Sequence, residues 1–476
     1  MVKRTASTIL PSAIVKREFD ESAEHTARKI NSNGSSLATL LTQRDRYPCA
    51  SGLVIDYLDI TDVIALTRVC KALSTVYSHS VSRDWDINSR LSRFITDPAD
   101  FRRILGVNQG LIVGSTAFQF FARVYWENSS LDVFCESGAA VRAISAYLRK
   151  KGYRRQCTNK FWGGLPEGFE YRITTYVKNG APNTKVNVIS AGIMSIWGFL
   201  AGPVFSTASA CFIAWDKAYC LFPKYTFGLR KVKFAHGLDT AFDSVHAMLC
   251  KYEQNGCCLI DSSFEQGPDV LQDCKDTIKH LEGPRRIGDA KTWSIPLDCE
   301  GIPPIEVNST VLEKHSFRVS VERDQGKLFF MIQTGEFQCF LLKHRYTFDA
   351  LPDPQDDSHE YLRFVLCRRA AVQIEKHLDA GTFTLSRNEV RDVLRSMNAV
   401  TEQDVGMCDE LCHLLFYCQD KGGFTKPENW QHVDHLIPEI YAEWLKYQYD
   451  HGVVKTEIKE ENDDGEHIEE GMEEDW

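Results

Sequence analysis

The pattern of apolar and polar positions divides the chain into three kinds of structure. Apolar residues recur at helical spacing from Leu53 to Tyr77, which predicts two or three short amphipathic helices. From Leu111 to Ser190, short apolar runs alternate with helical stretches. This alternation is typical of α/β and α+β folds. We therefore expect an α+β protein with a mixed sheet behind a small helical module.

Several helices and strands predicted between Leu111 and Ser190 end at residues that favour turns or helix caps. Leu111 to Val113 is a short apolar run, and Gly114-Ser115 follows it at the expected start of a helix. A second helix is expected from Gly138 to Lys151, with Gly152 as its cap. Asn179-Gly180 is a turn signal between two predicted strands.

The spacing of apolar residues changes twice in the last part of the chain, after Trp293 and again after Tyr361. From Trp293 to Phe348 apolar residues alternate with polar ones, and a turn is expected at Asp324-Gln325-Gly326. Together these features predict an antiparallel meander. From Tyr361 to Tyr449 the apolar spacing becomes helical again.

These patterns predict a series of segments along the chain. Asp97-Pro98 marks the break between the helical module and the α/β domain. We expect a flexible tail at 1–44, a helical module at 45–95, an α/β domain with a helical extension at 97–292, an antiparallel β segment at 293–350, a helical segment at 355–452 and an acidic tail at 453–476.

Charge is concentrated at one end of the chain. The 476 residues carry a net charge of -10, and residues 455–476 hold eleven acidic and two basic side chains, which leaves -1 for the rest. A nearly neutral body argues against a general nucleic-acid surface. The hydrophobic and charged fractions, 43% and 25%, are ordinary globular values. We expect no nucleic-acid partner.

Neither secretion nor membrane insertion is expected. The basic N-terminus, with Lys3 and Arg4, lacks the apolar core of a signal peptide, so the 16 cysteines are expected as free thiols in the cytoplasm or nucleus. Val186 to Trp215 contains no charged side chain, but the Gly202-Pro203 break favours two short buried elements over a membrane span.

The stretch from Ile55 to Leu73 resembles an F-box, because Tyr57-Leu58-Asp59 precedes a helix of the form DxxxLxxVCKxL. The opening "LPxE" of that family is reduced here to Tyr47-Pro48-Cys49-Ala50. The resemblance implies a helical module that docks on the Skp adaptor of an SCF ubiquitin ligase. The contact residues it implies are Pro48, Leu53, Leu58, Ile60, Val63, Leu66, Val69 and Cys70. An ordinary helical subdomain with a buried apolar stripe has the same spacing.

Residues 46–300 are similar to a group of fungal proteins in which an F-box precedes a nucleotidyltransferase-like domain. The motifs that carry this likeness are Phe94, Asp97-Pro98, Phe101-Arg102, Leu111 to Ser115, Leu131-Asp132 and Lys151-Gly152-Tyr153. The resemblance implies the fold of a nucleotidyltransferase more firmly than its activity.

Nucleotidyl transfer requires two magnesium ions, held by carboxylates at positions i and i+2 of one strand and by a third on a neighbouring strand. This chain has Ser130, Asp132 and Asn187 at those places. Hydroxyl and amide oxygens are weak magnesium ligands. We therefore expect a degenerate nucleotide pocket, made of Gly114, Ser115, Ser130, Asp132 and Asn187, with no metal, no cofactor and no catalytic residue. Nucleotide binding without turnover, and transfer that uses Asp132, are the alternatives.

Two further motifs carry candidate chemistry. Lys16, Lys455 and Lys459 each lie in an apolar-Lys-x-Glu pattern that resembles a SUMO acceptor site. Zinc ligation by the group Cys408, Cys412, His413 and Cys418 is less favoured than cysteines packed on one helical stripe. The expected function is that of a non-catalytic interaction protein, an SCF-type adaptor for an unknown target.

Overall fold

The protein combines helices with a mixed sheet, as the α+β pattern predicts. The computed structural model describes residues 37–42, 48–58, 60–70, 73, 76–77, 83–161, 171–190, 206–228, 231–233, 250–254, 257–260, 282–305, 309–324, 327–337, 342–348, 365, 376 and 430–450. Contacts divide the chain into two compact units, 1–80 and 81–476.

The first unit is helical. It contains α2 (Leu37–Thr42), α3 (Pro48–Tyr57) and α4 (Ile60–Val69). Leu41, Ile55, Val63, Leu73 and Val76 form its core. Helix α2 lies within the residues that we expected to be a tail, and the buried Leu41 makes it part of the module. A six-residue helix is too short to show a helical period in the sequence.

The helical module ends earlier than predicted. We placed its end at residue 95, but residues 83–95 pack on the α/β unit. The rings of Trp85 and Trp293 meet edge to face, with centroids 5.7 Å apart, and the Tyr153 hydroxyl donates to the Phe94 carbonyl. Apolar spacing identifies a helical stretch but not the unit on which it packs.

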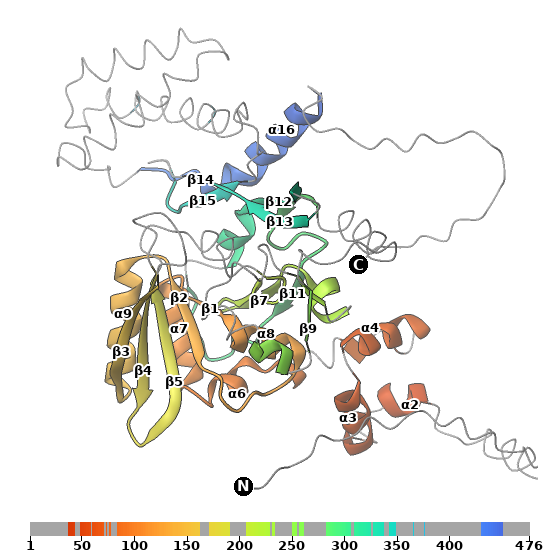
Figure 1. Ribbon diagram of the computed structural model, residues 1–476, viewed down its shortest axis with the longest axis vertical. Coiled ribbons are helices and arrows are strands. Elements are labelled where there is room, and N and C mark those ends of the chain that lie inside the picture. The colour runs from red at the N-terminus through yellow and green to blue at the C-terminus, as the bar shows by residue number, and fades with distance from the viewer. Residues whose placement is uncertain are drawn as a thin grey trace, which may run out of the picture. The chain divides into compact units, whose positions relative to one another are not determined.

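A large mixed sheet organises the second unit (Figure 1). Its eight strands lie in the order β11-β7-β6-β1-β2-β5-β4-β3, and β2 and β5 are the one parallel pair within this sheet. The strands are β1 (Leu111–Val113), β2 (Leu131–Cys135), β3 (Tyr153–Phe161), β4 (Tyr171–Lys178), β5 (Ala181–Ser190), β6 (Cys211–Ile213), β7 (Lys217–Cys220) and β11 (Trp293–Pro296).

Two helices connect strands of the sheet, and the glycine signals of the sequence are confirmed after α9 and in the turn between β4 and β5. Helix α8 (Gly114–Ala122) follows β1, and α9 (Gly138–Lys150) follows β2 and packs on β3 and β5. Gly152 and Gly180 have φ angles of 86° and 79°. Glycine adopts this left-handed region without the steric cost that a Cβ brings.

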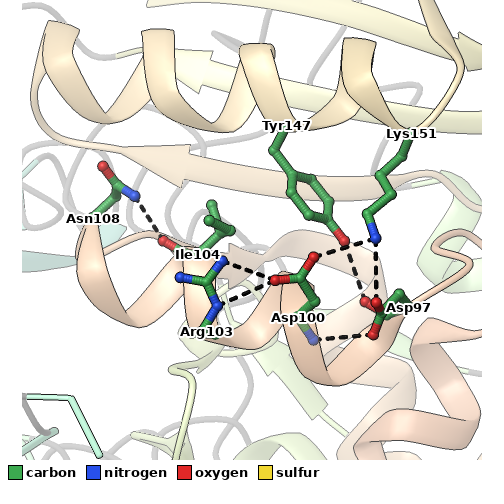
Figure 2. Close-up of polar contacts among 7 residues, drawn as sticks. All are labelled: Asp97, Asp100, Arg103, Ile104, Asn108, Tyr147 and Lys151. Atoms are coloured by element: carbon green, nitrogen blue, oxygen red, sulfur yellow. Dashed lines mark hydrogen bonds and ion pairs between the residues drawn. The ribbon is translucent and has the colours of Figure 1, made fainter. Parts of the chain in front are cut away.

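Helix α7 (Pro98–Val107) packs on α9 and is anchored to it by polar contacts (Figure 2). The Lys151 ammonium lies 3.2 Å from a carboxylate oxygen of Asp97 and 3.2 Å from one of Asp100. The Tyr147 hydroxyl donates to the Asp97 carbonyl over 3.2 Å. Asp97 also caps α7, because its carboxylate accepts from the Asp100 amide. The predicted break at Asp97-Pro98 is therefore a helix start.

A buried arginine on α7 joins distant parts of the second unit. The Arg102 guanidinium, 1% exposed, donates to the carbonyls of Trp215 and Asp298 at 2.6 to 2.9 Å. It also donates to the Asn88 amide oxygen at 3.0 Å. Asn88 belongs to α6 (Ile87–Leu91). One side chain therefore links two helices to the loops that flank β7 and β11.

The β segment that follows differs from a simple meander. Strand β11, predicted as its beginning, pairs with β7 in the large sheet. The predicted hairpin is confirmed as β12 (Ser316–Asp324) and β13 (Lys327–Gln333), and β10 (Gly283–Arg286) adds a third strand beside β12. Period-two spacing predicts strands but not their partners.

The remaining elements are a π-helical turn η2 (Lys224–Gly228), β8 (Lys231–Lys233), β9 (Cys258–Ile260), η4 (Ser309–Lys314), β14 (Gly335–Phe337) and β15 (Tyr346–Phe348).

The Asp434 carboxylate joins the start of α16 (Ile437–Asp450) to residues 343–346. Asp434 begins the turn η5 (Asp434–Leu436), which leads into α16 (Ile437–Asp450). It accepts from the amides of Lys343 and His344 at 2.8 and 3.1 Å and from the Tyr346 hydroxyl at 2.7 Å. Although burial alone would raise its pKa, these donors hold the pKa of Asp434 below its usual value.

Some predictions fall outside the described residues. These are the SUMO-like sites at Lys16, Lys455 and Lys459, the Cys408 to Cys418 group, and most of the tails and of the 355–452 helical segment. Among the residues that the structure describes, every helix is too short or too polar to cross a bilayer.

Candidate functional site

The predicted pocket residues come together where β1 ends and β2 begins. Strand register places Asp132 of β2 opposite Val113 of β1 on one side and opposite Asn187 of β5 on the other. Gly114 follows Val113 directly, and Ser130 precedes β2. The sheet therefore gathers residues that are up to 73 positions apart in the chain.

Hydrogen bonds close this cluster on itself. Asp132 Oδ1 accepts from Ser130 Oγ and from Asn187 Nδ2, each over 2.8 Å. Thr175 Oγ1 of β4 donates to Asn187 Oδ1 over 2.9 Å, which fixes the orientation of the amide. The two side chains that stand where a metal site would have carboxylates thus act as donors to the one carboxylate that is present.

Gly114 fits closely against the same carboxylate. Its φ is 69°, and a Cβ at this position would lie 2.9 Å from Asp132 Oδ2. A side chain here would meet both the strain of the left-handed region and a clash with the acid. The Gly-Ser turn is therefore required by its contact with Asp132, whether or not a phosphate binds there.

A lysine completes the cluster. Residues 250–254 form a helical turn, and Lys251 Nζ lies 3.5 Å from Ser115 Oγ and 5.6 Å from the centroid of the Trp126 ring. Burial is the main cause that lowers the Lys251 pKa, and the charge of Asp132 opposes it. The site therefore holds one carboxylate and one ammonium where nucleotidyltransferase chemistry requires three carboxylates.

The charge of the cluster makes it a poor site for divalent cations. Burial raises the pKa of Asp132, while Asn187, Ser130 and Lys251 favour its ionised form. A magnesium ion at Asp132 would find one carboxylate oxygen already accepting two hydrogen bonds and would be repelled by Lys251. Within the described part of the chain, no group of three or more His, Cys, Asp and Glu residues is placed to hold a metal ion.

Sequence reasoning identified most of this cluster but not all of it. Ser115, Ser130, Asp132 and Asn187 lie where the strand-turn-helix layout places them. Lys251 was missed because it lies in a polar stretch 119 residues beyond Asp132, with no spacing that links the two. Thr175 was missed as well, since strand periodicity does not reveal cross-strand register.

The predicted adaptor-binding residues divide into exposed and buried groups. Leu53 and Val69 are 60% and 70% exposed, and Cys70 is exposed as well. Val63 is fully buried in the core of the first unit, so its placement in a contact surface was wrong. Leu58 and Leu66 are half-buried and pack against that core.

A large exposed residue on the same helices was missed. Tyr57 is 90% exposed and lies four positions after Leu53, on the same side of α3. The side chains of Pro48 and Ile60 lie outside the described part of the structure. Helices α3 and α4 thus bury one apolar stripe and leave Leu53, Tyr57 and Val69 in contact with solvent. We call these three residues the exposed apolar set.

Comparison of the chain with protein-family models, with curated proteins and with solved structures found no match.

Proposed function

We propose that this protein acts by binding other proteins and not by catalysis, as an F-box-type adaptor that docks on the Skp subunit of an SCF ubiquitin ligase. The observation that carries the proposal is the exposed apolar set on α3 and α4. Large apolar side chains beside a small core favour a surface that a partner covers. Their position within the Ile55 to Leu73 motif supports a Skp-type partner.

The Asp132 cluster supports the non-catalytic part of the proposal. Its hydrogen bonds satisfy one oxygen of the carboxylate internally, and the charge of Lys251 opposes that of the carboxylate. An α/β domain with such a site serves best as a scaffold that recognises a target protein.

Co-purification with the Skp adaptor tests the docking surface. Leu53→Asp together with Val69→Asp places two charges where a partner would cover apolar surface, and we expect at least a ten-fold loss of affinity, about 1.4 kcal/mol or more. Both positions are exposed, so the fold should remain intact. Binding that is unchanged by the double substitution would refute the adaptor role.

Matched controls use the same two positions. Leu53→Met with Val69→Ile keeps the apolar surface and should keep adaptor binding within about two-fold. Leu58 and Leu66 are poor probes, because they pack against the core and an aspartate at either position would destabilise the unit itself.

Nucleotide binding without turnover is the second candidate function. It is favoured by the N-terminus of α8, where Ser115 and Lys251 lie close together and no side chain caps the helix. Amides at a helix N-terminus and a nearby ammonium suit a phosphate group. A rise in the melting temperature with nucleoside triphosphate, absent in Lys251→Ala, would support it.

A further inference from the structure

Strand β3 lies at one end of the eight-stranded sheet, with one edge that faces away from β4 (Figure 1). Throughout the described ranges, β4 is the one strand that pairs with it. A strand at the end of a sheet presents a row of backbone amides and carbonyls that can pair with another extended segment. With nine residues, Tyr153–Phe161, β3 is longer than the usual length of about five or six.

The middle of β3 is accessible from both faces of the sheet. Residues 154–159 are all exposed, although successive side chains of a strand point to opposite faces. A strand with one covered face would instead alternate buried and exposed positions. Tyr153, at the start of the strand, is buried. Beyond Tyr153, therefore, neither face is covered, and a second chain can reach the backbone edge.

A β-bulge divides this edge into two runs. The pairing with β4 shifts between Arg155 and Cys157, which leaves Gln156 out of register. A bulge bends its strand and makes the pairing of two long edges unfavourable. The run from Cys157 to Phe161 pairs with β4 without interruption, and the sequence of β3 contains no proline. Its five residues are the length of an ordinary strand, so the edge suits a short added strand.

Charge decides what kind of strand fits best. Strands β3, β4 and β5 together contain six lysines and arginines and no aspartate or glutamate. Arg154 and Arg155 are adjacent and exposed, so their side chains lie on opposite faces of the sheet. The side chains of an added strand alternate in the same way, so two adjacent acids can lie one beside each arginine. An acidic segment is therefore complementary on both faces.

Two other occupants fit this edge less well. A second copy of β3 would bring the same positive charge against Arg154 and Arg155, and like charges on neighbouring strands are destabilising. The chain's own residues 455–476 are acidic, but fourteen of these 22 residues are Glu, Asp, Asn or Gly, which strands disfavour. An acidic segment of another protein, rich in residues that favour strands, meets both requirements.

We propose that the outer edge of β3, between Arg154 and Phe161, binds an acidic segment of another protein, which adds to the large sheet as an extended strand. Main-chain hydrogen bonds would supply affinity, and the two arginines would select acids. The inference rests on the proposed function, since it names the kind of segment by which a target is recognised. Peptide binding is measured without the Skp adaptor, so either proposal can fail alone.

The test is fluorescence anisotropy of the full chain with a labelled synthetic peptide of about ten residues, in which a central Asp-Glu pair is flanked by alternating valine and threonine. Binding should slow amide hydrogen exchange within 154–161. A second peptide of equal charge, with proline in place of every valine, lacks donors for pairing and should bind at least about ten-fold more weakly.

Charge reversal tests the two arginines. Arg154→Glu with Arg155→Glu should weaken binding by about ten-fold or more, and a peptide with a central Lys-Lys pair should then bind this variant better than the parent. Both positions are exposed, so the fold should remain intact. Arg286→Glu with Lys446→Glu makes the same charge change at exposed positions away from β3, and this control should change affinity by less than about three-fold.

Four outcomes would overturn the proposal. The first is no binding at up to about 1 mM peptide. The second is equal binding of the proline peptide, which would show charge attraction without strand pairing. The third is a loss in Arg154→Glu with Arg155→Glu no greater than in the control pair. The last is a different occupant: a synthetic peptide of residues 455–476 that binds more tightly, or a dimer of the chain that the acidic peptide dissociates.

Discussion

Replacement of Arg102 by Met is expected to lower the free energy of unfolding by about 3 kcal/mol. Methionine keeps much of the apolar volume of the side chain but removes every donor. The carbonyls of Trp215 and Asp298 and the amide oxygen of Asn88 would then lose their partner in a buried place. Burial lowers the pKa of Arg102, but a guanidinium remains charged at any ordinary pH.

Arg103→Met on the same helix is the matched control. The Arg103 side chain is 38% exposed, and its guanidinium contacts the Asp100 carboxylate alone among the residues drawn in Figure 2. Exposed ion pairs contribute less than about 1 kcal/mol. Urea unfolding of both variants checks the prediction, and an equal loss in the two would show that the buried network does not stabilise the fold.

The second large effect is expected on the free energy of unfolding, which should depend on pH through His315. This side chain is buried between η4 and β12, and its Nδ1 accepts from the Thr347 amide over 3.2 Å. Burial, with a smaller contribution from the charge of His344, lowers the pKa of His315 to about 3. The same ring has a pKa of about 6.5 in an unfolded chain.

The sign of the pH effect follows from these two values. Between about pH 6.5 and pH 3 the unfolded chain holds a proton on this ring that the folded protein does not, so stability falls as the pH falls. At about pH 4.5, protonation of this ring in the unfolded chain lowers the free energy of unfolding by about 2 to 3 kcal/mol relative to pH 7.

His315→Asn isolates the contribution of the ring, because asparagine offers an acceptor for the Thr347 amide and does not titrate. Urea unfolding of both proteins at about pH 7 and pH 4.5 gives the comparison. The variant should lose less stability than the parent over this interval by about 2 to 3 kcal/mol. Equal losses would mean that the folded protein accepts the proton and that the pKa is not lowered.

Much of the fold around the Asp132 cluster follows from local signals in the sequence. Gly152 and Gly180 mark a helix end and a hairpin turn because their backbone lies where side chains are disfavoured. The short apolar run before Gly114 and the Leu131-Asp132 strand lie next to each other in the sheet, as their layout predicts. The acid and its two neutral neighbours were identified from that layout together with the positions at which nucleotidyl transfer requires carboxylates.

What the sequence did not reveal depends on contacts between distant residues. Strand β11 joins the large sheet through Trp293 and Cys220, and no local period encodes that choice. Lys251 reaches the cluster from a segment far along the chain. Val63 and Leu53 share one helical pattern, yet one is buried and the other exposed. Tertiary packing decides each of these outcomes.

Magnesium-dependent nucleotide transfer is the activity that bears most directly on the account, because a protein that acts by binding should lack it. The measurement is the incorporation of labelled nucleoside triphosphates by the purified full chain with magnesium or manganese. Because Asp132 is held by Ser130 and Asn187 and faces the charge of Lys251, we expect no incorporation. Incorporation that disappears in Asp132→Ala would contradict the account and identify the cluster as an active site.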